Sequence, residues 1–144
     1  MKSESELKSE LATAIELRLP GWMFLGHEDV RRCGTPDRTL TGHGVTSWWE
    51  GKCGAPTFKS KGQQELTCMQ LAGAGRCRYV IWMEEADGLG QRTLVVHPRE
   101  LFRAPRLSGS RRDARDLAPF AEASFAGIDH PSVVEWMHRF HGGK

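Results

Sequence analysis

Three ionisable residues in the stretch between Gly34 and Lys52 have the types and the spacing to do chemistry. Asp37 follows a proline, and Glu50 and Lys52 lie two positions apart, directly after two tryptophans. Successive side chains of a strand alternate between faces, so Glu50 and Lys52 would share one face, with Gly51 between them on the other. If the two segments pair as strands, two carboxylates and an ammonium meet at one point. Such a cluster of charges is costly to assemble unless a ligand binds there, and a divalent cation is the natural ligand.

The chemistry that these residues favour is phosphodiester hydrolysis. Oxygen ligands suit Mg²⁺, which binds through one or two carboxylates and keeps several waters. We expect Asp37 and Glu50 to hold Mg²⁺ or Mn²⁺, with the carbonyl of Gly51 as a further ligand. Lys52 would position or activate the attacking water and stabilise charge in the transition state.

Hydrophobic periodicity and turn residues predict the elements that must position this site. Apolar residues at helical spacing indicate helices over 4–19 and 63–73. Runs of β-branched and aromatic residues indicate strands at 22–25, 39–41, 45–50, 77–83 and 92–96. Residues 51–62 are predicted to form a loop. The order α-β-β-β-α-β-β implies a mixed sheet covered by helices, because the second helix allows a crossover between strands.

The composition of the chain changes after Arg103. Residues 103–116 are rich in Arg, Ser and Gly, which is typical of a mobile basic segment. A helix is predicted over 129–141, docked on the core or on a partner, and a weaker one over 117–125. We therefore divide the chain into a domain at residues 1–104 and an extension at 105–144 that packs on or near the core.

The overall composition indicates a soluble globular protein. The 144 residues suffice for one domain, and the formal charge of +2 does not by itself require a nucleic-acid partner, although arginines cluster locally. The four cysteines lack the spacing of a zinc site, which favours reduced thiols. The sequence predicts neither a membrane span nor an export signal, so we expect a cytoplasmic location.

The pattern of these residues resembles that of the PD-(D/E)XK nuclease superfamily. The core motif is Pro36-Asp37 followed by Glu50-Gly51-Lys52. The arginines and the glycine before the aspartate (residues 31–34) and the glutamine-bearing helix after the lysine (residues 60–75) are similar to the VRR-NUC branch and to archaeal-type Holliday junction resolvases. The resemblance covers about residues 4–100. It implies an α/β fold with a restriction-endonuclease-like mixed β-sheet, an α-β-β-β-α-β core, and a helical tail outside it.

The resemblance also implies further site residues. A glutamine of the second helix would support catalysis, and Gln64 is preferred to Gln63. A glutamate of the first helix would complete the metal site. Glu10 is preferred because it borders the apolar stripe of that helix, and Glu6 comes second.

Two positions depart from the family pattern. Arg38 stands where an apolar residue is usual, and Gly51 stands where a β-branched residue is common. Basic residues that flank the site in the sequence are expected to hold phosphates, namely Arg31, Arg32, Arg38, Lys59 and Lys61.

These observations together predict a Mg²⁺- or Mn²⁺-dependent endonuclease that acts on DNA and favours junctions, flaps or other branched structures. The resemblance further implies a small phage-type protein that works as a homodimer in a bacterial host. The alternative is a nuclease-fold protein that binds DNA or a protein partner without cleavage, which Arg38 and Gly51 favour. The sequence does not separate DNA from RNA as the substrate.

Overall fold

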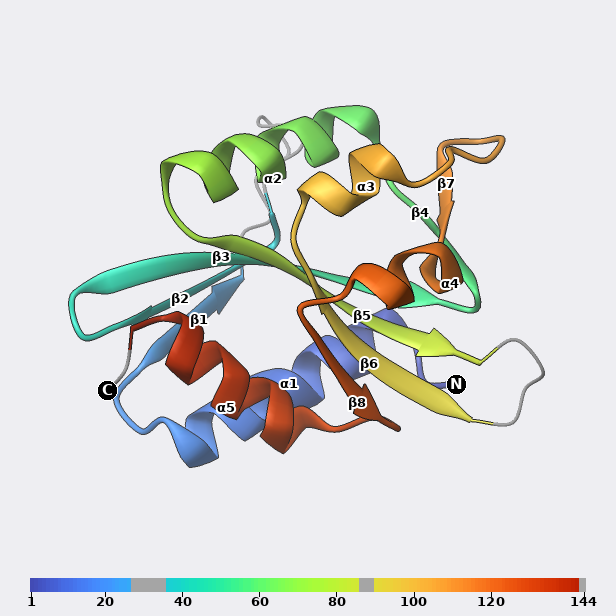
Figure 1. Ribbon diagram of the computed structural model, residues 1–144. Coiled ribbons are helices and arrows are strands. Elements are labelled where there is room, and N and C mark those ends of the chain that lie inside the picture. Colours follow the sequence, from blue (N-terminus) through green and yellow to red (C-terminus); the bar gives the residue numbers. More distant parts are fainter. Residues whose placement is uncertain (27–35, 86–89, 143–144) are drawn as a thin grey trace.

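A mixed six-stranded sheet forms the centre of this α/β fold (Figure 1). The computed structural model describes residues 1–26, 36–85 and 90–142. The strand order is β1-β2-β3-β5-β6-β8, and the pairs are antiparallel except for β3 and β5, which run parallel. The strands of this sheet are β1 (Met23–Gly26), β2 (Arg38–Gly42), β3 (Val45–Gly54), β5 (Cys77–Glu84), β6 (Gln91–Val96) and β8 (Ala123–Ala126).

Helices cover both faces of this sheet (Figure 1). On one face lie α1 (Glu4–Arg18) and α5 (His130–Phe140). The other face carries α2 (Gly62–Ala74), α3 (Arg99–Arg103), α4 (Ala114–Leu117) and the short 3₁₀ helix η1 (Ala118–Phe120). A second, two-stranded sheet joins β4 (Thr57–Lys59) to β7 (Arg111–Asp113). None of the helices in the described part of the chain is long and apolar enough to cross a membrane.

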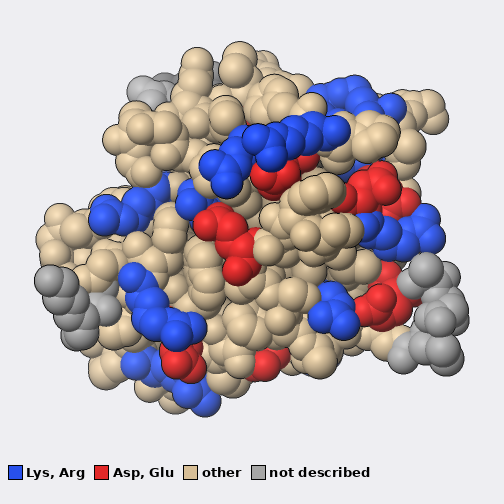
Figure 2. All heavy atoms as spheres, in the orientation of Figure 1, with Lys and Arg blue, Asp and Glu red and all other residues tan. Residues whose placement is uncertain are grey.

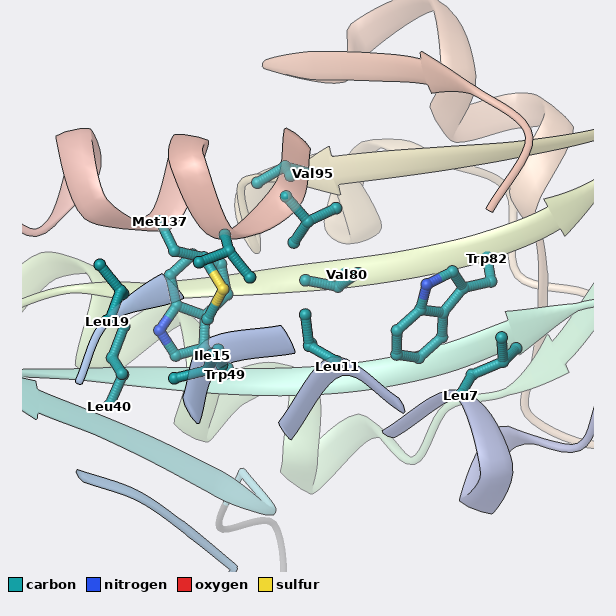
Figure 3. Packing of buried hydrophobic residues seen from close by; sticks show 12 residues of the cluster. Leu7, Leu11, Ile15, Leu19, Leu40, Trp49, Val80, Trp82, Val95 and Met137 are labelled. Carbon is teal, nitrogen blue, oxygen red and sulfur yellow. The ribbon is translucent and has the colours of Figure 1, made fainter. Parts of the chain in front are cut away.

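The sequence of α1 explains both its start and its buried face. Ser3 and Glu6 form a capping box, which satisfies backbone donors at the start of the helix. Leu7, Leu11 and Ile15 recur at helical spacing and are buried. Figure 3 shows these side chains packed towards two tryptophans of the sheet and Met137 of α5. This cluster fixes α1 across the sheet and so determines which of its polar residues approach β3.

The opposite face has its own core and a buried ion pair. Tyr79, Ile81 and Leu94 pack there against α2, α3 and α4. Glu65 of α2 is fully buried and accepts hydrogen bonds from Arg112 of β7 at 2.8 and 3.0 Å. Burial raises the pKa of Glu65, but the hydrogen bonds and charges of the arginines outweigh burial, so the net pKa is lowered. The tail is therefore tied to the core by charge as well as by apolar contacts.

The structure confirms the predicted helices and strands up to β6, adds β4 between β3 and α2, and corrects three segments. Residues 51–62 are not a loop, because β3 pairs with β5 as far as Gly54 and β4 follows. Residues 103–116 contain β7 and α4, and Arg112 is buried, so this basic segment is packed against the core. The helix predicted over 117–125 is instead η1 followed by β8, which adds to the edge of the sheet beside β6. The helix predicted over 129–141 is confirmed as α5.

Candidate functional site

The predicted residues meet where β2 begins and β3 runs on past it. β2 pairs with β3 up to Arg38 opposite Trp49, and β3 then continues for five more residues beside β5. Asp37 precedes β2, and its backbone N–H donates to Glu50 Oε1 at 3.1 Å. The prediction that strand pairing brings Asp37 beside Glu50 is confirmed. The step in the sheet leaves room at this point for side chains from α1.

Glu50 is a buried carboxyl group with a strongly shifted pKa. Its side chain is 3% exposed, and Lys52 Nζ lies 3.5 Å from its Oε2. Burial raises the pKa of Glu50 to about 7, and the nearby charge of Asp37 adds to the shift. Lys52, Lys8 and the N–H of Asp37 oppose the shift without cancelling it. A carboxyl group that titrates near neutrality in a recess of the sheet is typical of a functional site.

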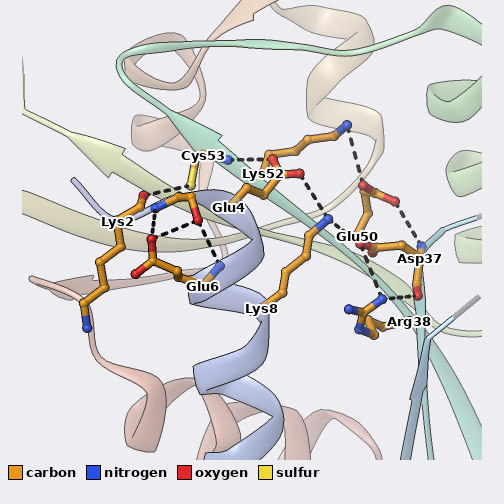
Figure 4. A network of polar contacts seen from close by, with 10 residues as sticks. Lys2, Glu4, Glu6, Lys8, Asp37, Arg38, Glu50, Lys52 and Cys53 are labelled. Atoms are coloured by element: carbon orange, nitrogen blue, oxygen red, sulfur yellow. Dashed lines mark hydrogen bonds and ion pairs between the residues drawn. The ribbon is translucent and has the colours of Figure 1, made fainter.

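A lysine of α1 that the sequence analysis did not select completes the charged group. Lys8 Nζ forms an ion pair with Asp37 Oδ2 and lies 3.1 Å from Glu4 Oε2 (Figure 4). Burial opposes the charge on Lys8, but the hydrogen bond and the charge of Asp37 prevail, so the pKa of Lys8 is raised. Helical spacing could have predicted this position for Lys8, because Lys8 lies three residues before Leu11, at the edge of the buried stripe.

The absence of a side chain at Gly51 allows Lys8 to reach Asp37. A Cβ atom at Gly51 would lie 3.0 Å from Lys8 Cε and 3.0 Å from the ring of Trp82. Both distances are at the lower limit for such contacts. The departure from a β-branched residue at this position therefore has a local cause: the lysine stem crosses the strand there.

The glutamates of α1 take roles other than the predicted one. Glu10 pairs with Lys2 and accepts a hydrogen bond from His130 Nε2 at 3.0 Å, so the structure does not bring it to Asp37. Glu6 takes part in the capping box at the start of the helix. Glu4 lies closest to the site, since it accepts the backbone N–H of Cys53 at 3.1 Å and pairs with Lys8 (Figure 4). The rotation of α1 imposed by its apolar stripe thus directs Glu4 and Lys8, and not Glu10, towards β3.

The carboxylates nevertheless offer a donor set that a hard cation would accept. Asp37 Oδ1 is buried and has no hydrogen-bond partner in the described part of the chain. Buried carboxylate oxygens without partners are unusual and call for an explanation. Among the described residues, no three His, Cys, Asp or Glu side chains cluster closely enough to hold a metal ion. A divalent cation here would have to be held by the pair Asp37 and Glu50, completed by waters, which is a common way for proteins to bind Mg²⁺.

An open groove lies beside the site, over Lys8 and Arg38. Its volume is about 510 Å³, and it is lined by residues of α1 and β1 and by Arg38. Lys8 and Arg38 line the groove and also the small cavity beneath it that reaches Glu50 and Gly51. Arg38 Nη1 donates to the backbone carbonyl of Asp37 at 2.8 Å, which holds the guanidinium at the mouth of the site. Two cationic side chains therefore stand between the groove and the carboxylates.

Three of the other predicted residues are described, and none of them forms a hydrogen bond or an ion pair with the carboxylates. Gln64 is half-buried in the first turn of α2, and in the described residues no hydrogen bond joins it to Asp37, Glu50 or Lys52. Lys59 and Lys61 are exposed, and Lys59 stands opposite Arg111 of β7. Arg31 and Arg32 lie outside the described residues.

Comparisons with known proteins add no assignment. No protein-family model matches the chain, and no curated protein matches it significantly.

Proposed function

We propose that the chain is a metal-dependent nuclease that hydrolyses phosphodiester bonds in DNA. The observation that carries the proposal is the meeting of Asp37, with its unpartnered Oδ1, and the buried Glu50 beside Lys52. The position of these residues in the fold supports it too. An aspartate before the second strand and Glu-x-Lys on the third, after a first helix and before a crossover helix, form the arrangement expected of a restriction-endonuclease-like core.

In this proposal each residue has a distinct role. Asp37 and Glu50 hold Mg²⁺ or Mn²⁺, and the backbone carbonyl of Gly51 is the proposed further ligand. The bound ion supplies polarisation of the phosphoryl group and acidification of a water. Lys52 orients that water and stabilises the negative charge that grows on the phosphoryl oxygens. Glu50 accepts the N–H of Asp37, which keeps the two carboxylates in register.

Basic side chains give the phosphate backbone several places to bind. Lys8 and Arg38 line the groove beside the site. Lys59 in β4 and Lys61 at the start of α2 add exposed positive charges. Figure 2 shows Lys and Arg side chains gathered in a band over α3 on the face drawn there. Contacts of this kind read the shape of a nucleic acid and not its base sequence. The preference for branched DNA, the homodimer and the cytoplasmic location stay predictions.

One observation favours the alternative, a protein that binds nucleic acid without cutting it. Lys8 already pairs with Asp37, and Lys52 already pairs with Glu50, so two ammonium groups face two carboxylates. A site whose charges balance without a metal has less need of one. A cleavage assay with and without the cation distinguishes the two functions.

The test uses labelled Holliday junction, flap, linear duplex and RNA, each with Mg²⁺ or Mn²⁺. The wild type is expected to cleave DNA, and Lys52→Ala is expected to lose about 100-fold or more in rate. The matched control is Lys2→Ala, an exposed lysine that pairs with Glu10 outside the proposed site, which should retain most of the activity. Equal cleavage by wild type and Lys52→Ala would refute the proposed site. Salt-sensitive binding with no cleavage under any of these conditions would support the alternative.

A further inference from the structure

The position of Lys8 leads beyond the roles assigned above. Its side chain is 15% exposed and lies across Gly51, with its ammonium group on Asp37 Oδ2. The same residue lines both the open groove and the cavity that reaches Glu50. Arg38 lines the same groove and cavity, but its Nη1 lies 3.8 Å from Asp37 Oδ2, so Lys8 is the cation in closer contact with this proposed metal ligand.

We propose that Lys8 is a phosphate-binding residue of the groove that serves, in the free protein, as the counter-ion of Asp37. The inference rests on the proposed function. When a phosphodiester enters the groove, the ammonium group turns from Asp37 Oδ2 to a phosphate oxygen. Asp37 Oδ2 then loses its nearest cation, with Arg38 Nη1 3.8 Å away, and can join Oδ1 in binding a divalent cation. Nucleic acid and metal thus bind cooperatively, because each favours the arrangement in which Lys8 has left Asp37.

The local structure allows this exchange at small cost. Lys8 is held by its ion pair with Asp37 and by Glu4, whose carboxylate lies 3.1 Å from its ammonium group. Glu4 is 41% exposed and is anchored to β3 through the N–H of Cys53, so it stays in place when Lys8 turns. A lysine side chain has several rotatable bonds and binds phosphate as a point charge. The glycine under its stem leaves the lower part of the chain free of a steric barrier.

Electrostatics determines whether removal of the Lys8 charge strengthens or weakens metal binding. A divalent cation beside Asp37 and a positive charge on Lys8 repel each other strongly in a partly buried site. Removal of the Lys8 charge should therefore strengthen metal binding when no nucleic acid is present. The same change removes one phosphate contact and should weaken nucleic-acid binding. A residue with a purely structural role would not produce opposite changes in the two affinities.

The experiment measures Ca²⁺ binding by calorimetry with and without a short DNA duplex. Ca²⁺ takes the same hard oxygen ligands and serves here as the probe ion. Lys8→Met keeps the apolar stem over Gly51 and removes the charge, and Lys8→Gln is a second variant in case the first does not fold. Lys2→Met is the matched control, since Lys2 is exposed and binds Glu10.

For Lys8→Met we expect Ca²⁺ to bind on the order of tenfold more tightly than to wild type without the duplex. The duplex should tighten Ca²⁺ binding in the wild type and do so much less in the variant. The slope of the logarithm of duplex affinity against the logarithm of salt concentration should fall by about 0.9 in the variant. Lys2→Met should match the wild type in Ca²⁺ affinity.

Two failures are distinguishable. If the wild type binds Ca²⁺ and the duplex, but Lys8→Met and Lys8→Gln bind Ca²⁺ no more tightly and show the same coupling, the role of Lys8 is refuted and the nuclease proposal stands. If neither wild type nor variants bind Ca²⁺ with or without the duplex, both proposals are overturned.

Discussion

The raised pKa of Glu50 makes a sharp prediction about folding stability in the absence of metal. The pKa rises from an ordinary 4.5 to about 7 in the folded protein. A raised pKa means that the folded state favours the protonated carboxyl group. The contribution to stability is fully present below the unfolded pKa and is lost as the pH rises through the folded pKa. From about pH 5 to about pH 8.5, Glu50 should therefore cost the protein roughly 2.5 kcal/mol of stability.

The perturbation is Glu50→Gln, which keeps an oxygen to accept the N–H of Asp37 and removes the titrating group. Urea unfolding in the presence of a chelator, at about pH 5 and about pH 8.5, gives the free energy of unfolding for each protein. The loss of stability between the two pH values should be smaller in the variant than in the wild type by roughly 2.5 kcal/mol.

Glu10 provides a control of opposite sign. Its hydrogen bond with Lys2, followed by that with His130, lowers its pKa, so the stability it contributes is present at higher pH and is lost as the pH falls. Glu10→Gln should therefore leave intact the fall in stability between about pH 5 and about pH 8.5. Identical pH profiles for wild type and Glu50→Gln would refute the assignment of Glu50 as the buried neutral carboxyl group.

Two further predictions concern packing around the site and the tail. Gly51→Ala should destabilise the protein by about 1–2 kcal/mol and displace Lys8, because the new methyl group meets that side chain and a buried tryptophan ring. Gly73→Ala in α2 has no atom near its added carbon and should instead stabilise the protein slightly. Thermal or urea unfolding compares the stability of the two variants. Glu65→Ala should cost about 3–5 kcal/mol in urea unfolding, because it leaves Arg112 charged and buried, and a loss below about 1 kcal/mol would show that the pair is not buried in solution.

The sequence predicts those parts of the fold that depend on local hydrophobic periodicity. The stripe of α1 and the hairpin between β2 and β3 depend on residues close together in the chain, so their positions could be inferred. The hairpin also fixed which carboxylates would meet, since antiparallel pairing places Asp37 beside Glu50 once the turn is located. The central pair of the candidate site therefore followed from the sequence.

The rest of the site depends on how distant elements pack. Glu10 and Lys8 both border the apolar stripe, and only the seating of α1 on the sheet decides that Lys8 reaches Asp37 while Glu10 meets His130. The charge pair of Glu65 and Arg112 joins residues far apart in the chain, and no local pattern marks it. β8 is a short, partly exposed segment, so its strand conformation comes from pairing with β6 and not from intrinsic preference.

The packing of α5 against α1 has a consequence for synthesis. The buried face of α1 is closed by Val133, Val134 and Met137, which are synthesised well after α1. Domains fold as units during synthesis, so the apolar stripe of α1 waits until α5 has left the exit tunnel. The position of Lys8 beside the carboxylates depends on the packing of that stripe. A chain whose translation stops before α5 would thus carry every residue of the proposed site and still lack the assembled site.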